Sequence, residues 1–265
     1  WQHHFGRGIV RSTNNFGMLG DPPTHPQLLD WLARDFMDNG WTMKRLHKLI
    51  VMSSVWQQSS APNAAAYEKD PQNNLFWKHE MRRLSAEEIR DSLYAATGEL
   101  NLKMHGPGIY PEIPAEILAG QSRPGAGWGD SPPEEEARRA VYIHVKRSLI
   151  TPLLAEFDFC ETDSSCADRF STVQPTQALG MLNGDFLQQR AGKFADRLRS
   201  LSDDTGEQIR QSIWIALQRP PQQGDVERGQ KLIDRLKTEH GLDDRQALEL
   251  YALMVLNLNE FLYLD

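Results

Sequence analysis

The sequence lacks most of the features that identify a protein's chemistry at once. Only two of its 265 residues are cysteine, and acidic residues outnumber basic ones by 36 to 29, for a formal net charge of -7. No apolar run approaches the roughly 20 residues that span a bilayer. A surface that follows nucleic-acid phosphates needs a basic excess or a clustered basic face, so the charge argues against nucleic acid as the main partner.

The common catalytic motifs are also missing. The chain has no GxSxG, GxGxxG, P-loop or HExxH pattern, and no two histidines stand four residues apart. Cys160 and Cys166 form neither a CxxC nor a CxxCH motif, so the chain encodes no zinc knuckle and no covalent haem site. Their spacing leaves a small-loop disulfide and two free thiols equally open.

Helix signals dominate what is present. A helix start at Thr24–Pro26 precedes leucine and phenylalanine residues at helical spacing, and Thr42 caps a second helix. Ser85 and Glu88 form a capping-box pattern ahead of a third. The last third of the chain keeps helical spacing, and its final helix, residues 245 to about 258, is apolar on most sides. We therefore expect that helix to be central.

Two segments interrupt the helical pattern. Six glycines and six prolines fall between His105 and Pro133, where no long helix can form. Loops of this length inside a compact domain are usually functional or mobile. Residues 141–145 are rich in β-branched and aromatic residues and predict a short strand. The predicted fold is mainly α, a multi-helix domain with a long Gly/Pro-rich loop and a minor β element.

The predicted domain organisation is a single domain over residues 1–265. A soft boundary near residues 200–205 could set apart a C-terminal helical subdomain, residues 205–265, or could be only a surface loop. The chain has no initiator Met, so we expect it to be a fragment of a longer protein. Its first ten residues are too rich in aromatics for a free tail, which predicts that Trp1 and Phe5 pack against the domain or against an upstream domain.

Residues 157–183 carry the densest group of polar candidates. Asp158, Glu161, Asp163 and Asp168 could offer hard oxygen ligands to Ca²⁺, but their spacing misses the EF-hand pattern, and solvation or capping is the commoner role. Asp158 alone could be a general base or a helix cap, and capping is favoured. Apart from this calcium alternative, we expect no metal and no cofactor in the chain.

A polar pocket is the main candidate site. In a strand, His144 and Lys146 would share one face, and with Asp158 or Asp163 they could bind an anionic or sugar ligand. A structural salt-bridge network is the favoured alternative, and it would include the arginines Arg138, Arg139 and Arg169. The full set of candidate site residues is Trp128, His144, Lys146, Arg147, Asp158, Asp163, Arg169, Gln174 and Gln177.

Two of these candidates have specific alternatives. Gln174 and Gln177 open a helix whose first-turn amides can attract an anion, although capping is their more frequent duty. Trp128 lies among glycines, and a Trp held in such a loop can stack on a sugar face or fill the core beneath the loop. The sequence does not decide between these two roles.

Several blocks of sequence point to a family: WQHHFGRGIV, PPTHPQLLDWLARDF, GWTMKRLHKLIVMSSVWQQSS, MRRLSAEEIRDSL, RRAVYIHVKRSL and SCADRFSTVQPTQALGMLN. In this order they resemble the planctomycete secreted domain, a family of unknown function, over residues 1–265. The resemblance implies an exported, periplasmic or extracellular, C-terminal module of larger proteins. Such proteins often carry a second family-specific domain upstream, and sometimes a c-type cytochrome or carbohydrate-binding-like domain, so haem is expected only in a separate domain.

The family brings no agreed catalytic residues to this chain. Cys166 matches its pattern, whereas relatives usually have Pro or another residue in place of Cys160, so a bridge between the two would be a local addition. The leading hypothesis is an accessory module that binds upstream domains of its own chain or a ligand, and that is linked to polysaccharide use. The first alternative is an enzyme acting on complex carbohydrate, and its pocket residues would be Asp158, His144, Lys146 and Arg169. A third hypothesis is an electron-transfer partner of a cytochrome.

Overall fold

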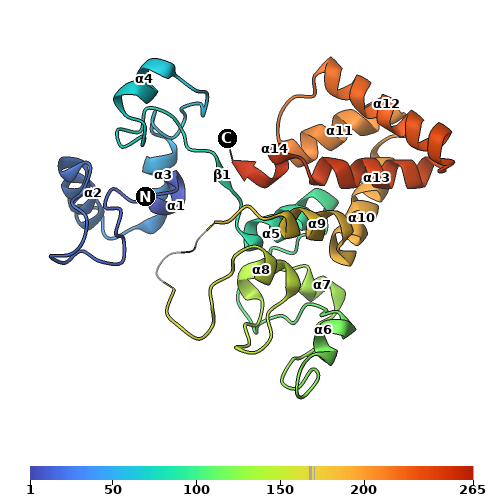
Figure 1. Cartoon of the computed structure of the whole chain (residues 1–265), viewed down its shortest axis with the longest axis horizontal. Coiled ribbons are helices and arrows are strands. Elements are labelled where there is room, and N and C mark those ends of the chain that lie inside the picture. The colour runs from blue at the N-terminus through green and yellow to red at the C-terminus, as the bar shows by residue number, and fades with distance from the viewer. Residues whose placement is uncertain (167–168, 170, 265) are drawn as a thin grey trace. The chain divides into compact units, whose positions relative to one another are not determined.

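The computed structural model of the chain describes residues 1–166, 169 and 171–264 (Figure 1). Its fold is mainly α with a minor β element, as predicted. In the described residues the β element is one sheet of two short strands, β1 (Arg82–Arg83) and β2 (Tyr263–Leu264). None of the helices in this part of the chain combines the length and apolar composition needed to cross a membrane.

The chain divides into two compact units. Unit 1 comprises residues 1–82 and the residues from 263 on, and unit 2 comprises residues 83–262. That the two units act together as a single domain remains a prediction.

Unit 1 has a small aromatic core. Its helices are α1 (Gln2–Phe5), α2 (Pro26–Asp38), α3 (Met43–Val51) and α4 (Ala64–Lys69). Phe5, Ile50 and Phe76 are buried together. The ring of Trp1 stacks on Phe5 with centroids 4.4 Å apart, so the amino-terminal aromatics pack within this unit.

Unit 2 has the larger core. Its helices are α5 (Ala86–Thr97), α6 (Ala115–Ala119), α7 (Pro133–Glu136), η1 (Ala140–Tyr142), α8 (Pro152–Glu156), α9 (Pro175–Asn183), α10 (Asp185–Leu201), α11 (Thr205–Leu217), α12 (Gln223–His240), α13 (Asp244–Leu256) and α14 (Asn259–Leu262). Helix α13 packs against α10, α11 and α12 (Figure 1) and buries seven of its residues, which confirms that the final long helix is central. Because α10 precedes residue 205 and shares this core, helices on both sides of the predicted subdomain boundary pack together.

Local capping fixes α5 where the sequence places it. The hydroxyl of Ser85 accepts a hydrogen bond from the amide of Glu88, and the Glu88 carboxylate accepts one from the amide of Ser85. Gly98 ends the helix in the left-handed conformation at φ 79°, where a side chain would be strained. The predicted capping box and C-cap are both present.

The predicted strand over residues 141–145 is wrong. Ala140–Tyr142 form the 3-10 helix η1, and the residues after it make only isolated bridges, between Ile109 and Ile143 and between Lys146 and Leu149. β-propensity needs a neighbouring strand to become a ladder, and the proline-rich segment around Ile109 offers a partner for one bridge only.

The Gly/Pro loop contains one helix, the five-residue α6, so the prediction that no long helix forms there is confirmed. A fully buried arginine, Arg138, anchors the start of the loop. Its guanidinium donates to the carbonyls of Pro107 at 3.1 Å and His105 at 2.5 Å, and it lies 3.9 Å from the centroid of the Tyr142 ring. The loop is therefore tied to unit 2 through its backbone carbonyls.

Candidate functional site

Three rings in unit 2 form a cluster that we call the aromatic cluster: Tyr110, Trp128 and His144. The ring centroids of Tyr110 and His144 are 4.8 Å apart, and those of Tyr110 and Trp128 are 5.6 Å apart at an interplanar angle of 85°. Trp128 and His144 are separated by 5.9 Å. All three side chains are half-buried, so each is partly packed and partly accessible to solvent.

A backbone bridge brings two of these rings together. The amide of Ile109 donates to the carbonyl of Tyr142, and the amide of His144 donates to the carbonyl of Ile109, both at 2.8 Å. Ile109 and Ile143 point into the core, at 1% and 8% exposure. Each isoleucine precedes a ring of the cluster, so the side chains of Tyr110 and His144 are held side by side away from the core.

Trp128 is fixed by its own hydrogen bond and by the glycine after it. Its indole N–H donates to the carbonyl of Pro111 at 3.0 Å, which sets the orientation of the ring. A Cβ on Gly129 would lie 2.9 Å from the ring of Tyr110, so a residue with a side chain could not sit there without moving the ring. The glycines around Trp128 thus allow the loop backbone to pack directly on Tyr110.

Lys146 contacts the loop backbone just before Trp128. Its ammonium group donates to the carbonyl of Ala126 and lies beside Gly127. Glu112 and Asp130 each follow a ring of the cluster by two residues. Burial is the largest cause that raises the pKa of Glu136, and the negative charges of Glu112 and Asp130 raise it further. The surroundings of the cluster therefore carry both signs of charge.

Asp158 lies in a separate arrangement, which we call the Asp158 network. Its carboxylate accepts hydrogen bonds from the Arg83 guanidinium at 2.7 Å, from the amide and hydroxyl of Thr172 at 2.9 and 2.7 Å, and from the Gln177 amide at 3.4 Å. Burial alone would raise the pKa of Asp158, but the hydrogen bonds from Thr172 and Arg83 outweigh it and lower the pKa. A carboxylate engaged in this way is well suited to hold structure and poorly suited to take a proton.

Gln177 of α9 and Gln174, the N-cap of that helix, belong to the same network. The amide oxygen of Gln177 accepts from the backbone N–H of Gln174 at 3.1 Å and from Arg83 at 2.8 Å. Its amide nitrogen donates to the carbonyl of Glu156 at 2.9 Å. Gln177 is buried, and its side-chain amide makes all of these contacts. Its role is therefore to cap the start of α9 and hold it in place.

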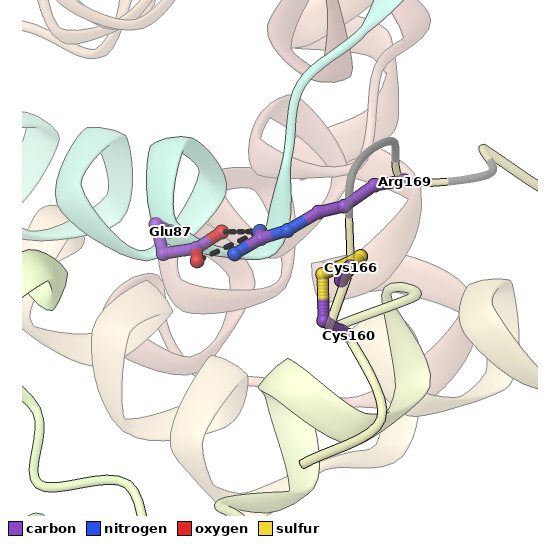
Figure 2. Close-up of a disulfide and its surroundings, with 4 residues drawn as sticks. All are labelled: Glu87, Cys160, Cys166 and Arg169. Carbon is purple, nitrogen blue, oxygen red and sulfur yellow. Dashed lines mark hydrogen bonds and ion pairs between the residues drawn. A yellow bond between two sulfur atoms is a disulfide. The ribbon is translucent and has the colours of Figure 1, made fainter. Parts of the chain in front are cut away.

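The acidic loop is closed by a disulfide between Cys160 and Cys166 (Figure 2). Beyond the bridge, Arg169 reaches α5, where its guanidinium lies 2.8 Å from both carboxylate oxygens of Glu87. The Arg169 guanidinium also covers the ring of Phe159, 4.7 Å from its centroid. The ion pair fastens the loop to α5, and the ring contact holds the Arg169 side chain within the loop.

The remaining candidate residues lie at the surface or outside the described part of the chain. Arg147 and Asp163 form an ion pair at 2.7 Å with both side chains more than 70% exposed, so its contribution to stability is small. Asp168 lies outside the described residues. In the part of the chain that is described, no group of three or more His, Cys, Asp or Glu side chains is arranged to hold a metal ion.

The arginines of the alternative structural network each have a separate partner. Arg138 pairs with Glu135, Arg139 with Asp91, and Arg169 with Glu87. The structure thus brings Trp128, His144 and Lys146 together, and it gives Asp158 and Arg169 other partners.

Sequence reasoning missed Tyr110 and Arg83. An aromatic residue between Gly108 and Pro111, in the same loop as Trp128, is the signal that could have pointed to Tyr110. Arg83 has no such signal, because its partners Asp158 and Gln177 are 75 and 94 residues away.

Comparison with known proteins gives a family and nothing beyond it. No curated protein and no solved structure matches the chain. The model of the family PSD1, described as a protein of unknown function (DUF1553), matches residues 1–233, from the first helix into α12. The match covers most of the chain, and it includes the aromatic cluster and the Asp158 network. The chain therefore belongs to the PSD1 family of proteins of unknown function.

Proposed function

We propose that this chain is an accessory module of an exported multidomain protein, and that it binds a polysaccharide at the aromatic cluster. The observation that carries the proposal is the placement of Trp128, a half-exposed ring locked by a hydrogen bond to the Pro111 carbonyl and flanked by Tyr110 and His144. Aromatic side chains with one apolar face and one wet edge are the common means of binding ligands that are both apolar and polar.

Preorganisation supports the binding role. Ordering a loop when a ligand arrives costs affinity, and a loop already held in place avoids that cost. Here Gly129 packs against the Tyr110 ring and Lys146 holds the Ala126 carbonyl, so the rings keep their positions in the free protein. A sugar chain lying on the cluster would contact the exposed parts of the rings, and the imidazole of His144 and the ammonium group of Lys146 would offer hydrogen bonds to its hydroxyl groups.

Export is part of the proposal, and the disulfide supports it. Disulfides persist in oxidising compartments and are rare in a reducing cytosol. Upstream domains of the same chain are the second proposed partner. Unit 1 supports this partner because it exposes large apolar side chains of the kind that interaction surfaces use: Phe16, Met18, Leu19, Trp31 and Trp41.

A sugar-polymer array tests the binding role. The chain and its Trp128→Ala and Tyr110→Ala variants would be compared with Trp214→Ala, which removes an exposed tryptophan of α11 in the same unit. We expect the unmodified chain to bind at least one polymer and the two cluster variants to bind at least tenfold more weakly, while Trp214→Ala binds normally. Binding to no polymer, or an equal loss in Trp214→Ala, would contradict the proposal.

The same array separates binding from catalysis. The enzyme alternative places a polar pocket around Asp158, whose carboxylate already accepts hydrogen bonds from Arg83, Thr172 and Gln177. Release of sugar products that stops in an Asp158→Asn variant would favour the enzyme. Binding without product release would favour the accessory module.

A further inference from the structure

Two histidines of unit 1, far from each other in the sequence, face one another through ring nitrogens. The Nε2 atom of His4 in α1 lies 2.8 Å from the Nδ1 atom of His47 in α3. At this distance one ring donates a proton to the lone pair of the other. A neutral imidazole carries its proton on either nitrogen, so a shift of the shared proton to the outer nitrogen of its ring leaves a lone pair on each of the two facing nitrogens.

The His4 ring is held in place by its neighbours. It stands perpendicular to the indole of Trp56, with centroids 5.4 Å apart, and the next residue, Phe5, is buried in the core of unit 1. His47 is exposed and follows Leu46, which packs against the same core. One nitrogen donor is therefore fixed and the other can adjust by rotating a surface side chain.

We propose that His4 and His47 form a two-histidine site for a borderline divalent cation such as Zn²⁺, with water completing the coordination. Imidazole suits Zn²⁺ and Cu²⁺, whereas Ca²⁺ and Mg²⁺ prefer oxygen ligands. Two nitrogens at the usual Zn–N distance on a tetrahedral ion stand about 3.3 Å apart, so the pair opens by about half an ångström when it binds. No third His, Cys, Asp or Glu stands beside the pair in the described residues, so the remaining coordination positions would be filled by water.

Titration with Zn²⁺ alone tests this site, using the whole chain without a histidine tag. His4→Gln and His47→Gln each remove one ligand, and His3→Gln is the matched control because His3 is an exposed neighbour of His4. We expect one equivalent of Zn²⁺ to bind, each ligand variant to weaken binding at least tenfold, and His3→Gln to bind as the unmodified chain does. Ca²⁺ should give no saturable binding.

Thermal melting gives a second readout. Because the metal ion would join α1 to α3, excess Zn²⁺ should raise the Tm of the unmodified chain and of His3→Gln, but not that of His47→Gln. His47 is exposed, so this variant keeps the test valid even if His4→Gln fails to fold. No saturable binding by the unmodified chain, or an equal loss in His3→Gln, would overturn the site and leave the pair as a hydrogen bond only.

Discussion

The carboxylate of Asp158 lies 2.7 Å from the guanidinium of Arg83, a residue 75 positions earlier in the chain. Both side chains are largely buried, and the remaining oxygen contacts of Asp158 go to Thr172 and Gln177 at the start of α9. Asp158 was the first candidate for acid–base chemistry in this sequence. Its contacts instead place it where three segments of unit 2 meet. Replacing Asp158 should therefore mainly lower the stability of the fold.

Asp158→Asn should lower the Tm by roughly 6–12 °C. The change leaves the Arg83 guanidinium buried without its counter-charge, which costs about 3 kcal/mol, and a chain of this size loses about 2–4 °C per kcal/mol. Asn tolerates the left-handed backbone of this position (φ 60°), so the variant tests the charge alone. Asp163→Asn, which breaks only the exposed pair with Arg147, is the control for the melt. Equal melting of the two variants would show that the Asp158 network is not structural.

Arg138→Ala should loosen the start of the Gly/Pro loop. The fully buried Arg138 guanidinium supplies hydrogen bonds to the carbonyls of His105 and Pro107, and the Ala variant removes both bonds that hold this segment. Hydrogen exchange of residues 101–110 should become faster. Arg139→Ala, which removes a half-exposed partner of Asp91, should leave exchange in this segment unchanged. Equal exchange in both variants would contradict the anchoring role.

Asp225 should make the stability of unit 2 depend on pH at the acidic end. The hydrogen bond from Arg219 is the largest cause that lowers its pKa from 3.8 to about 2. A lowered folded-state pKa gives stability that is complete above about pH 4 and is lost as the pH falls toward 2, on the order of 2 kcal/mol in total. Denaturant titrations across this range should show a smaller loss in Asp225→Asn than in the unmodified chain, while the part due to other carboxylates with a lowered pKa, such as Asp158, remains in both. Asp234→Asn, which changes an exposed acid on the same helix, should show the full loss.

Loss of the Cys160–Cys166 bridge should change the local mobility of the loop more than the stability of the whole fold. It encloses a short segment, and a short loop removes only about 2 kcal/mol of denatured-state entropy. Replacing both cysteines by serine should therefore lower the Tm by only a few degrees, while hydrogen exchange between residues 158 and 166 rises clearly. Thiol labelling of protein from an oxidising compartment should find no free cysteine. Full labelling of that protein would contradict the bridge.

The sequence predicts well those features that depend only on residues close together in the chain. The capping box at Ser85 and Glu88, the glycine stop at Gly98 and the apolar pattern of α13 all act within a few positions, and each appears where expected. The strand predicted at residues 141–145 failed because a strand depends on a partner that local propensity does not supply. The same limit explains why Trp128 and His144 were candidates, but their contact with each other and with Tyr110 was not predictable.

The most direct test of the proposed function follows the indole N–H signal of Trp128 by NMR during titration with an oligosaccharide of the polymer that binds on the array. Trp128→Phe assigns the signal, and the exposed Trp214 serves as the internal reference. If the aromatic cluster is the binding site, the Trp128 signal shifts and saturates with the ligand while the Trp214 signal stays in place. A titration that leaves Trp128 unmoved while the oligosaccharide binds elsewhere would contradict the account.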